Sequence, residues 1–302
     1  MKVNSAIISL FWNRFDFLIR FGYCRLGFLS KLFNRLLFWK LYSSDFEKLD
    51  KIFEDSLDIL KKNNISIKDK TILEIGPGNS YIVAYNFLMH GAKKVVLIDK
   101  FPRITKTKRQ REYFKREIDY IAKKYGQKPF FINSNEEIDT KYLQLIEGEL
   151  IEANIQKADL IFTNSVLEHI KQMQESIWSM SSILNNNGYM LHNIDLRDHY
   201  NFNKPFLFYK YSDWTWNVIL TKEGISYTNR LRYGDFVQLF QNAGLKTVFE
   251  KKRNEDLAAT KLCSSFRDKS KESLEVTFLS VLLQKSTDSG KCEEPHQEQE
   301  TE

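Results

Sequence analysis

The sequence has few cysteines, few prolines and no long apolar run, and each shortage excludes a class of protein. Its 302 residues include three cysteines and five prolines. Cys24, Cys263 and Cys292 share no spacing typical of a disulfide scaffold or a metal site, so we expect a reducing, cytoplasmic setting. No apolar run reaches the roughly 18 residues that a membrane-spanning helix needs. Arginines recur through the first apolar stretch, so we expect no cleaved signal peptide.

A strong charge of one sign is also lacking. The formal net charge is +6, and the basic residues gather in residues 1–42 and in residues 100–128. The second group lacks the interleaved aromatic residues that stack nucleic-acid bases, and a solvated helix face accounts for it, so we expect no nucleic-acid partner. Residues 286–302 are acidic and aperiodic, and we expect a disordered tail there.

The amino-terminal segment, residues 1–43, mixes aromatic, aliphatic and basic residues in a helical pattern broken near Gly22 and Gly27. Two interpretations stay open. The segment forms core or capping helices, or it forms amphipathic helices that touch the inner membrane surface through residues 1–42. Residues 44–285 then form the main domain, in which residues 195–232 are an insertion.

The main domain alternates short apolar runs with helical stretches, which is typical of a parallel sheet with helices on both faces. We therefore predict an α/β, doubly wound, Rossmann-like fold. The expected strands are 71–75, 95–99, 129–132, 159–163, 188–194, 245–250 and a last run at 274–284. The expected helices are 45–62, 80–90, 105–125, 140–155, 171–184 and 234–243.

Three kinds of residue mark the expected helix ends. Ser44 and Glu47 have the spacing of a capping box, in which each side chain accepts a hydrogen bond from the other residue's backbone N–H. Gly91, Gly188 and Gly244 each follow a helical pattern, where a left-handed residue commonly ends a helix. These signals predict where the chain turns.

A glycine pair follows the first strand in "TILEIGPGNS", residues 71–80. Gly76 and Gly78 let the backbone approach a ligand, and Asp99 ends the next strand at the same edge of the sheet, where a carboxylate can accept both hydroxyls of a ribose. A dinucleotide fingerprint needs a third glycine where Tyr81 stands, and no P-loop lysine follows. The turn is therefore expected to bind a nucleoside without phosphates.

The run Glu74-Ile75-Gly76-Pro77-Gly78 resembles the acidic-x-Gly-x-Gly loop of class I S-adenosylmethionine-dependent methyltransferases. The resemblance covers about residues 65–285 and extends to "ADLIFTNSVLEHI", similar to the fourth strand of that family. It departs at Ser80, where many members have a third glycine. It implies strand order 3-2-1-4-5-7-6, S-adenosyl-L-methionine as cofactor, and cofactor contacts from Glu74, Gly76, Pro77, Gly78, Asp99, Lys100, Asn133, Asn164 and Ser165.

Ionisable residues crowd into "HNIDLRDHY", residues 192–200, just after the fifth strand. Methylation of a hydroxyl gains from a general base, and we expect His199 in that role with Asp195 as its orienting carboxylate. His192 is a further candidate that equally fits a buried hydrogen bond, and His169 is a secondary one. A divalent cation held by His192, Asp195, Asp198 and His199 is the alternative, although we expect no metal.

The insertion suggests the acceptor. Tyr211 and Trp214 offer faces that stack on sugars, Arg230 and Arg232 offer forks for phosphate or carboxylate, and Asp198 is a further contact, although half of such aromatics usually pack internally. "HNIDLRDHY" followed by "TNRLR" also looks like bacterial methyltransferases associated with surface polysaccharide assembly. We therefore expect O-methylation of a sugar in a cell-surface or lipid-linked glycan.

Other functions stay open. A small-molecule O-methyltransferase acting on a quinone, a lipid or a phenolic natural product would use the same site. A cofactor-binding scaffold without catalysis would need no base at all. A nucleic-acid methyltransferase is disfavoured because "TNSV", residues 163–166, stands where amino-directed enzymes carry an NPPY-type tetrapeptide. The oligomeric state does not follow from the sequence.

Overall fold

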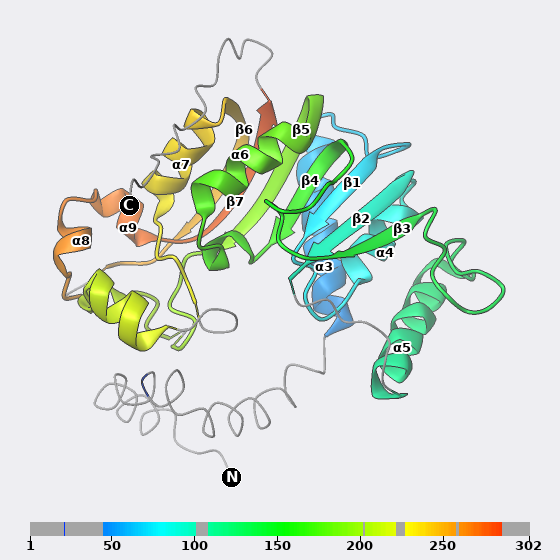
Figure 1. Ribbon diagram of the computed structural model, residues 1–302, viewed down its shortest axis with the longest axis horizontal. Coiled ribbons are helices and arrows are strands. Elements are labelled where there is room, and N and C mark those ends of the chain that lie inside the picture. Colours follow the sequence, from blue (N-terminus) through cyan, green and yellow to red (C-terminus); the bar gives the residue numbers. More distant parts are fainter. Residues whose placement is uncertain are drawn as a thin grey trace, which may run out of the picture.

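The centre of the molecule is a seven-stranded mixed sheet in the order β3-β2-β1-β4-β5-β7-β6 (Figure 1). The computed structural model describes residues 21, 45–100, 108–201, 203–221, 227–257 and 260–285. The strands are β1 (Thr71–Ile75), β2 (Lys94–Asp99), β3 (Leu143–Glu147), β4 (Ala158–Asn164), β5 (Leu184–Asp195), β6 (Leu245–Asn254) and β7 (Val276–Lys285). Strands β1 to β5 pair in parallel, whereas β7 runs antiparallel to both β5 and β6. The predicted fold class and strand order are confirmed.

Helices cover both faces of the sheet (Figure 1). Helices α3 (Phe46–Lys62), α4 (Ile82–Met89) and α5 (Lys108–Tyr125) share one apolar core that contains Phe53, Phe87 and Phe162. Helices α6 (Met173–Ile183) and α7 (Tyr233–Asn242) bury the other face around Ile177 and Phe240. Each fully buried side chain of this size contributes about 1.5–3 kcal/mol, so both cores fix the strand ends that carry the site.

The third strand is not where the sequence predicted it. Residues 129–132 form a loop whose Phe131 is buried and whose Ile132 makes an isolated bridge to Ile138. The predicted helix 140–155 is also wrong, because it contains β3. Strand β3 lies at the edge of the sheet, and its partial burial leaves a weak alternation that resembles helical spacing.

Two of the predicted helix ends also differ from the structure. The residue that caps α3 is Asp45 and not Ser44, and its carboxylate accepts a hydrogen bond from the backbone N–H of Lys48 at 3.2 Å. Gly188 lies inside β5, where a Cβ would come within 2.8 Å of Leu184, so close packing and not a left-handed turn requires glycine. Gly91 and Gly244 do adopt the predicted left-handed conformation, with φ of 92° and 69°.

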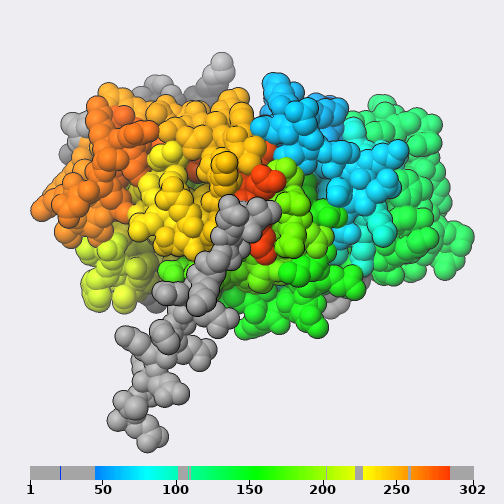
Figure 2. Space-filling model, turned by 90° about the horizontal axis from the view of Figure 1, so that it is seen from above, coloured from blue at the N-terminus to red at the C-terminus, as the bar shows by residue number. Residues whose placement is uncertain are grey.

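The insertion after β5 folds into a compact cap with its own apolar cluster. A 3-10 helix (Leu207–Lys210) and a π-helix (Thr215–Leu220) pack against α8 (Ser264–Arg267) and α9 (Lys271–Glu275). In Figures 1 and 2 the α8–α9 segment and α5 lie at opposite ends of the molecule. The cap follows the carboxyl end of β5 in the chain, and its own apolar cluster packs its described helices together.

Within the described ranges, no helix combines the length and the apolar character that crossing a membrane requires. The predictions for residues 1–43 and 286–302 fall outside those ranges, apart from Phe21.

Candidate active site

The glycine turn lies where the carboxyl ends of β1 and β4 meet. Gly76 and Gly78 have φ of 67° and 65°, a conformation that glycine adopts without strain. A Cβ at Gly76 would lie 2.7 Å from a methyl of Val166, whereas one at Gly78 would meet nothing within 4 Å. The first glycine therefore lets the turn pack on the segment after β4, and the second leaves an open backbone surface.

Glu74 lies beneath this turn with only 4% of its surface exposed. One carboxyl oxygen, Oε2, has no hydrogen-bond partner among the described residues. Burial, and secondarily the negative charge of Asp99, raises the pKa of Glu74 to about 8. A buried carboxyl with an unused oxygen suits a ligand that brings positive charge or N–H donors.

Asp99 ends β2 and its Oδ2 accepts a hydrogen bond from the backbone N–H of Gly78 at 3.1 Å. The carboxylate therefore lies beside the glycine turn, as predicted for a ribose contact. The next residue, Lys100, forms an ion pair with Glu149. The sequence analysis did not predict the contact with Glu149, because it placed the third strand at residues 129–132. The alternation of Leu143 and Leu145 before an acidic turn could have indicated the correct strand.

The remaining predicted cofactor residues divide into two groups. Asn164 ends β4 and Ser165 follows it at the surface, so both lie at the expected edge beside the glycine turn. Asn133 does not, because it belongs to the loop that leads into β3. Its side-chain oxygen instead accepts hydrogen bonds from the backbone N–H groups of Asn135 and Glu137, both at 2.9 Å.

Ser80 does not face the open turn, although it stands where many similar proteins carry glycine. Its hydroxyl donates a hydrogen bond to Glu117 of α5, which also accepts the backbone N–H of Tyr81 at 3.1 Å. Glu117 is 3% exposed and places negative charge at the amino end of α4, where the helix dipole favours it. No sequence pattern predicts this contact across 37 residues.

A second group, Glu168, His169 and His199, lies at the ends of β4 and β5. Their candidate ligand atoms are all within 4.8 Å of one another, and the two imidazole centroids are 4.8 Å apart. Burial raises the pKa of Glu168 to about 8 and lowers the pKa of His169. Burial and the neighbouring His169 lower the pKa of His199 to about 4. Both imidazoles are therefore neutral near pH 7.

Asp195 does not orient His199 through its carboxylate, contrary to the prediction. Both oxygens bind Arg197, with Nε–Oδ1 and Nη2–Oδ2 distances of 2.9 Å and 2.6 Å. Burial by itself would raise the pKa of Asp195, but the hydrogen bonds from Arg197 hold it below its ordinary value. The measured neighbour of the His199 ring is the ring of His169, with centroids 4.8 Å apart.

His192 and Asp198 are structural residues. His192 is fully buried between Thr163, whose hydroxyl is 2.9 Å from its Nδ1, and the ring of Phe240. Burial lowers its pKa to about 3, so it packs in the core as a neutral ring. Asp198 is 1% exposed and accepts the backbone N–H of Tyr200 at 2.9 Å, which closes a turn. Neither residue supports the predicted catalytic or substrate-binding role.

The two predicted acceptor arginines hold the cap in place. Arg230 donates to the main-chain oxygens of Tyr211 and Phe208 at 2.7 Å and 3.3 Å. Arg232 is 1% exposed and donates to the main-chain oxygens of Leu196 and Val276, both at 2.7 Å. Their guanidinium groups satisfy buried carbonyls and are not presented to an acceptor.

The two aromatic residues predicted to contact the substrate differ in their exposure. Tyr211 is 9% exposed and packs near Trp216, with ring centroids 6.4 Å apart. Trp214 is 65% exposed on the π-helix side of the cap. Of these two predicted substrate contacts, only Trp214 presents its ring to solvent.

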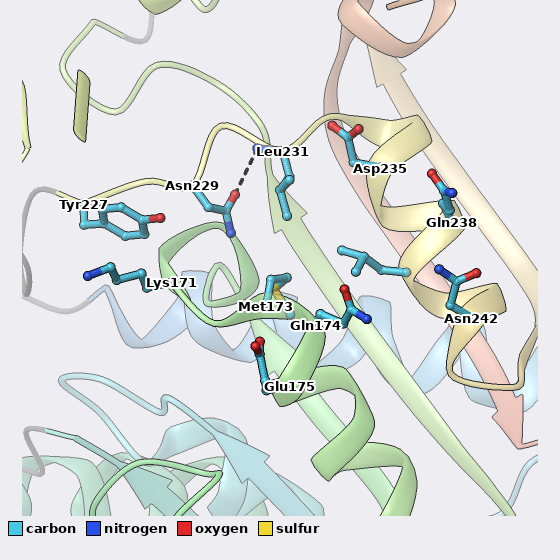
Figure 3. A pocket seen from close by; sticks show the side chains of 11 residues that line it. Lys171, Met173, Gln174, Glu175, Tyr227, Asn229, Leu231, Asp235, Gln238 and Asn242 are labelled. Carbon is cyan, nitrogen blue, oxygen red and sulfur yellow. Dashed lines mark hydrogen bonds between the residues drawn. The ribbon is translucent and has the colours of Figure 1, made fainter. Parts of the chain in front are cut away.

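A pocket that the sequence did not predict lies between α6 and α7, with a volume of about 580 Å³ (Figure 3). Its wall carries the side chains of Lys171, Met173, Gln174, Glu175, Tyr227, Asn229, Leu231, Asp235, Gln238, Leu239 and Asn242. Asn229 also binds the turn after β4, donating its backbone N–H to the carbonyl of Glu168 at 2.8 Å. The carbonyl of Tyr227 lies 2.7 Å from Nδ1 of His169. The pocket wall and the histidine pair therefore share a scaffold.

Comparison with known proteins gives one family match. Residues 44–250 match the model of a methyltransferase domain family. No curated protein matches the sequence.

Several solved structures are similar to this chain at low TM-scores. A candidate sarcosine dimethylglycine methyltransferase from Galdieria sulphuraria is 14% identical with a TM-score of 0.47, covering 78% of this chain and 86% of that one. S-adenosylmethionine-dependent methyltransferases from Mesorhizobium loti and Clostridium acetobutylicum are 12% and 11% identical, with TM-scores of 0.43 and 0.42. The two alignments include 76% and 86% of this chain, and 96% and 99% of the respective solved chains. At these TM-scores and identities the likeness carries no argument about this chain.

Proposed function

Because this chain belongs to the methyltransferase domain family and is an S-adenosyl-L-methionine-dependent methyltransferase, we propose that it methylates a hydroxyl of a sugar in a cell-surface or lipid-linked glycan. The observation that carries the cofactor assignment is the grouping of Glu74, the open turn at Gly78 and Asp99 at one edge of the sheet.

The residues present fit this cofactor. The unpartnered oxygen of Glu74 suits the positively charged methionine part, the bare backbone at Gly78 allows close approach, and Asp99 suits the ribose hydroxyls. S-adenosyl-L-methionine, when bound, supplies a methyl carbon on a sulfonium sulfur, which keeps the bond's electron pair when an acceptor oxygen takes the methyl group. The protein's main contribution is orientation, which supplies up to about 7–11 kcal/mol in favourable cases.

A hydroxyl acceptor is supported by the group formed by Glu168, His169 and His199. Neutral imidazoles accept hydrogen bonds from a hydroxyl. Glu168 lies two residues beyond Val166, the residue that a Cβ at Gly76 would meet, so the group is near the glycine turn. With a pKa of about 4, however, His199 is a weak proton acceptor on its own. Its part in the proposed function is to help position the acceptor at the end of β5, and not to take the proton alone.

A saccharide acceptor is supported by the pocket between α6 and α7 (Figure 3). The side chains of Gln174, Glu175, Gln238 and Asn242 line it and form no hydrogen bond to another described side chain. Amide and carboxylate groups of this kind pair with sugar hydroxyls. We propose that the pocket binds a further sugar unit of the acceptor.

The proposed function is tested by binding and transfer measured separately. Calorimetry with S-adenosyl-L-homocysteine should detect binding to the wild type and at least tenfold weaker binding to Asp99→Ala. Transfer of labelled methyl from the cofactor should then occur to saccharide acceptors and not to phenolic or quinone acceptors. Transfer to phenols alone would contradict the glycan acceptor and would indicate a small-molecule acceptor instead. Binding without transfer to any acceptor would favour a non-catalytic scaffold.

A further inference from the structure

Glu168, His169 and His199 converge on one point at the ends of β4 and β5, and we propose that they bind a divalent transition-metal ion. Glu168 and His169 lie in the 3-10 turn (Leu167–His169) after β4, and His199 lies in the loop after β5. One candidate ligand atom from each residue lies within 4.8 Å of the other two. The role of the metal in catalysis rests on the proposed function, whereas its binding does not.

Glu168 presents an unused oxygen to this point. Its side chain is 3% exposed, and Oε1 accepts the backbone N–H of Asp195 at 3.2 Å. The other oxygen, Oε2, has no hydrogen-bond partner among the described residues. A buried polar atom without a partner costs about 1–3 kcal/mol. A cation beside Oε2 removes that cost.

The hydrogen bond of His169 leaves one of its ring nitrogens with a lone pair. Nδ1 of His169 lies 2.7 Å from the main-chain oxygen of Tyr227, and a carbonyl only accepts, so Nδ1 carries the hydrogen and Nε2 carries the lone pair. The ring of His199 lies beside that of His169, with the two ring centroids 4.8 Å apart. Metal-binding histidines usually have such a carbonyl partner, which fixes the tautomer and the ring orientation.

The donor set indicates the kind of ion. Two imidazoles and one carboxylate suit zinc, cobalt, manganese or iron in the divalent state, whereas magnesium and calcium prefer oxygen ligands. Bonds of about 2.0–2.2 Å place neighbouring ligand atoms about 3 Å apart, so small rotations of these side chains close the site. Three protein ligands leave at least one position open for an acceptor.

The open position explains how an alcohol loses its proton here. The acceptor hydroxyl binds the metal through oxygen, its pKa falls, and its proton leaves to solvent. The O–CH₃ bond forms as the S–CH₃ bond breaks, the electron pair stays on sulfur, and the metal keeps its oxidation state. The site lies near the glycine turn because Val166, two residues before Glu168, packs against Gly76.

Metal binding is measured on the full chain, freed of any affinity tag and of bound metal. Titration with Co²⁺ should give visible absorption bands of a cobalt–imidazole complex that saturate at one equivalent, and Zn²⁺ should displace them. His169→Ala, His199→Gln and Glu168→Gln should each weaken Co²⁺ binding at least tenfold. His90→Gln is the matched control, because His90 caps the carboxyl end of α4 beside Asn86 and Tyr125. Co²⁺ binding by this variant should equal that of the wild type.

Circular dichroism and melting curves show which variants are folded, and the conclusion is drawn from those. The inference is overturned if the wild type gives no saturable cobalt spectrum, or if folded variants of all three residues keep wild-type affinity. A protein that binds Co²⁺ through these residues but methylates no saccharide would contradict the proposed function and leave the metal site standing. If the protein bound no Co²⁺ and still transferred methyl to a saccharide at the full rate without metal, the metal site would be refuted and the proposed function would stand.

Discussion

At the scale of single residues, Glu74 couples the cofactor site to pH. Its folded-state pKa is about 8, well above the ordinary carboxyl value of 4.5. The folded protein therefore holds a proton that the unfolded chain has released, and Glu74 makes the stability fall as pH rises from about 4.5 to about 8. Each unit of pKa difference corresponds to about 1.4 kcal/mol, so burying the charged form is costly.

We expect Glu74→Gln to stabilise the ligand-free protein and to weaken cofactor binding. The gain over wild type should be small at pH 5.5 and should grow toward pH 8.5, reaching a melting-temperature increase of about 2–4 °C for each kcal/mol gained. Melting curves across this pH range check it. Comparison with wild type at each pH removes the slope that Glu168 also contributes. An equal shift at all pH values would contradict the assigned pKa.

Gly76 and Gly78 form a matched pair for a second prediction. Alanine at either position adopts a left-handed conformation that costs about 1–2 kcal/mol. Gly76→Ala must also displace Val166, so it should destabilise the protein by clearly more than Gly78→Ala. Urea unfolding of both variants measures the difference. A second change, Val166→Ala, should recover part of the loss for Gly76→Ala and none for Gly78→Ala.

At the scale of secondary-structure elements, Arg232 joins the cap to the sheet. Its guanidinium binds the carbonyl of Leu196, just after β5, and the carbonyl of Val276, at the start of β7. Its Cζ also lies over the rings of Phe208 and Tyr209, 5.6 Å and 5.1 Å from their centroids. This one side chain therefore links three segments that are distant in sequence.

Replacing Arg232 by methionine should lower the free energy of unfolding by about 3 kcal/mol or more, because two buried carbonyls lose a charged donor. Arg232→Lys should recover little, since an ammonium lacks the planar fork that spans both carbonyls. Chemical denaturation checks both variants. Trp214→Ala, an exposed change on the same cap, is the control and should unfold within about 0.5 kcal/mol of wild type.

Most elements could be predicted from the sequence because their cores impose a strong period. Strand β1 and helix α3 have burial patterns that match their apolar spacing. The turn between β1 and α4 could be predicted because two closely spaced glycines follow the apolar run of β1. Strand β3 was missed because an edge strand buries little. Contacts between distant residues, such as Glu117 with Ser80 and Arg232 with Val276, leave no local pattern. The acceptor arginines were misassigned for that reason.

At the scale of the whole molecule, residues 1–42 lie outside the described ranges except for Phe21, and their membrane contact stays a proposal from sequence. If it holds, full-length protein should sediment with anionic vesicles and release as salt rises. Changing Arg14, Arg20 and Arg25 to glutamate should abolish sedimentation while cofactor binding is kept. Equal sedimentation of the two proteins would refute the proposal.

The position of β7 has a consequence for biosynthesis. β7 is the last of the described strands in sequence, yet it lies between β5 and β6 in the sheet. Until the ribosome has released residues 276–285, β5 has an open edge and β6 has no strand to pair with. Open strand edges can pair with strands of other chains and so promote aggregation. Nascent chains that stall before β7 should therefore need chaperones, whereas chains that carry it should close the sheet unaided.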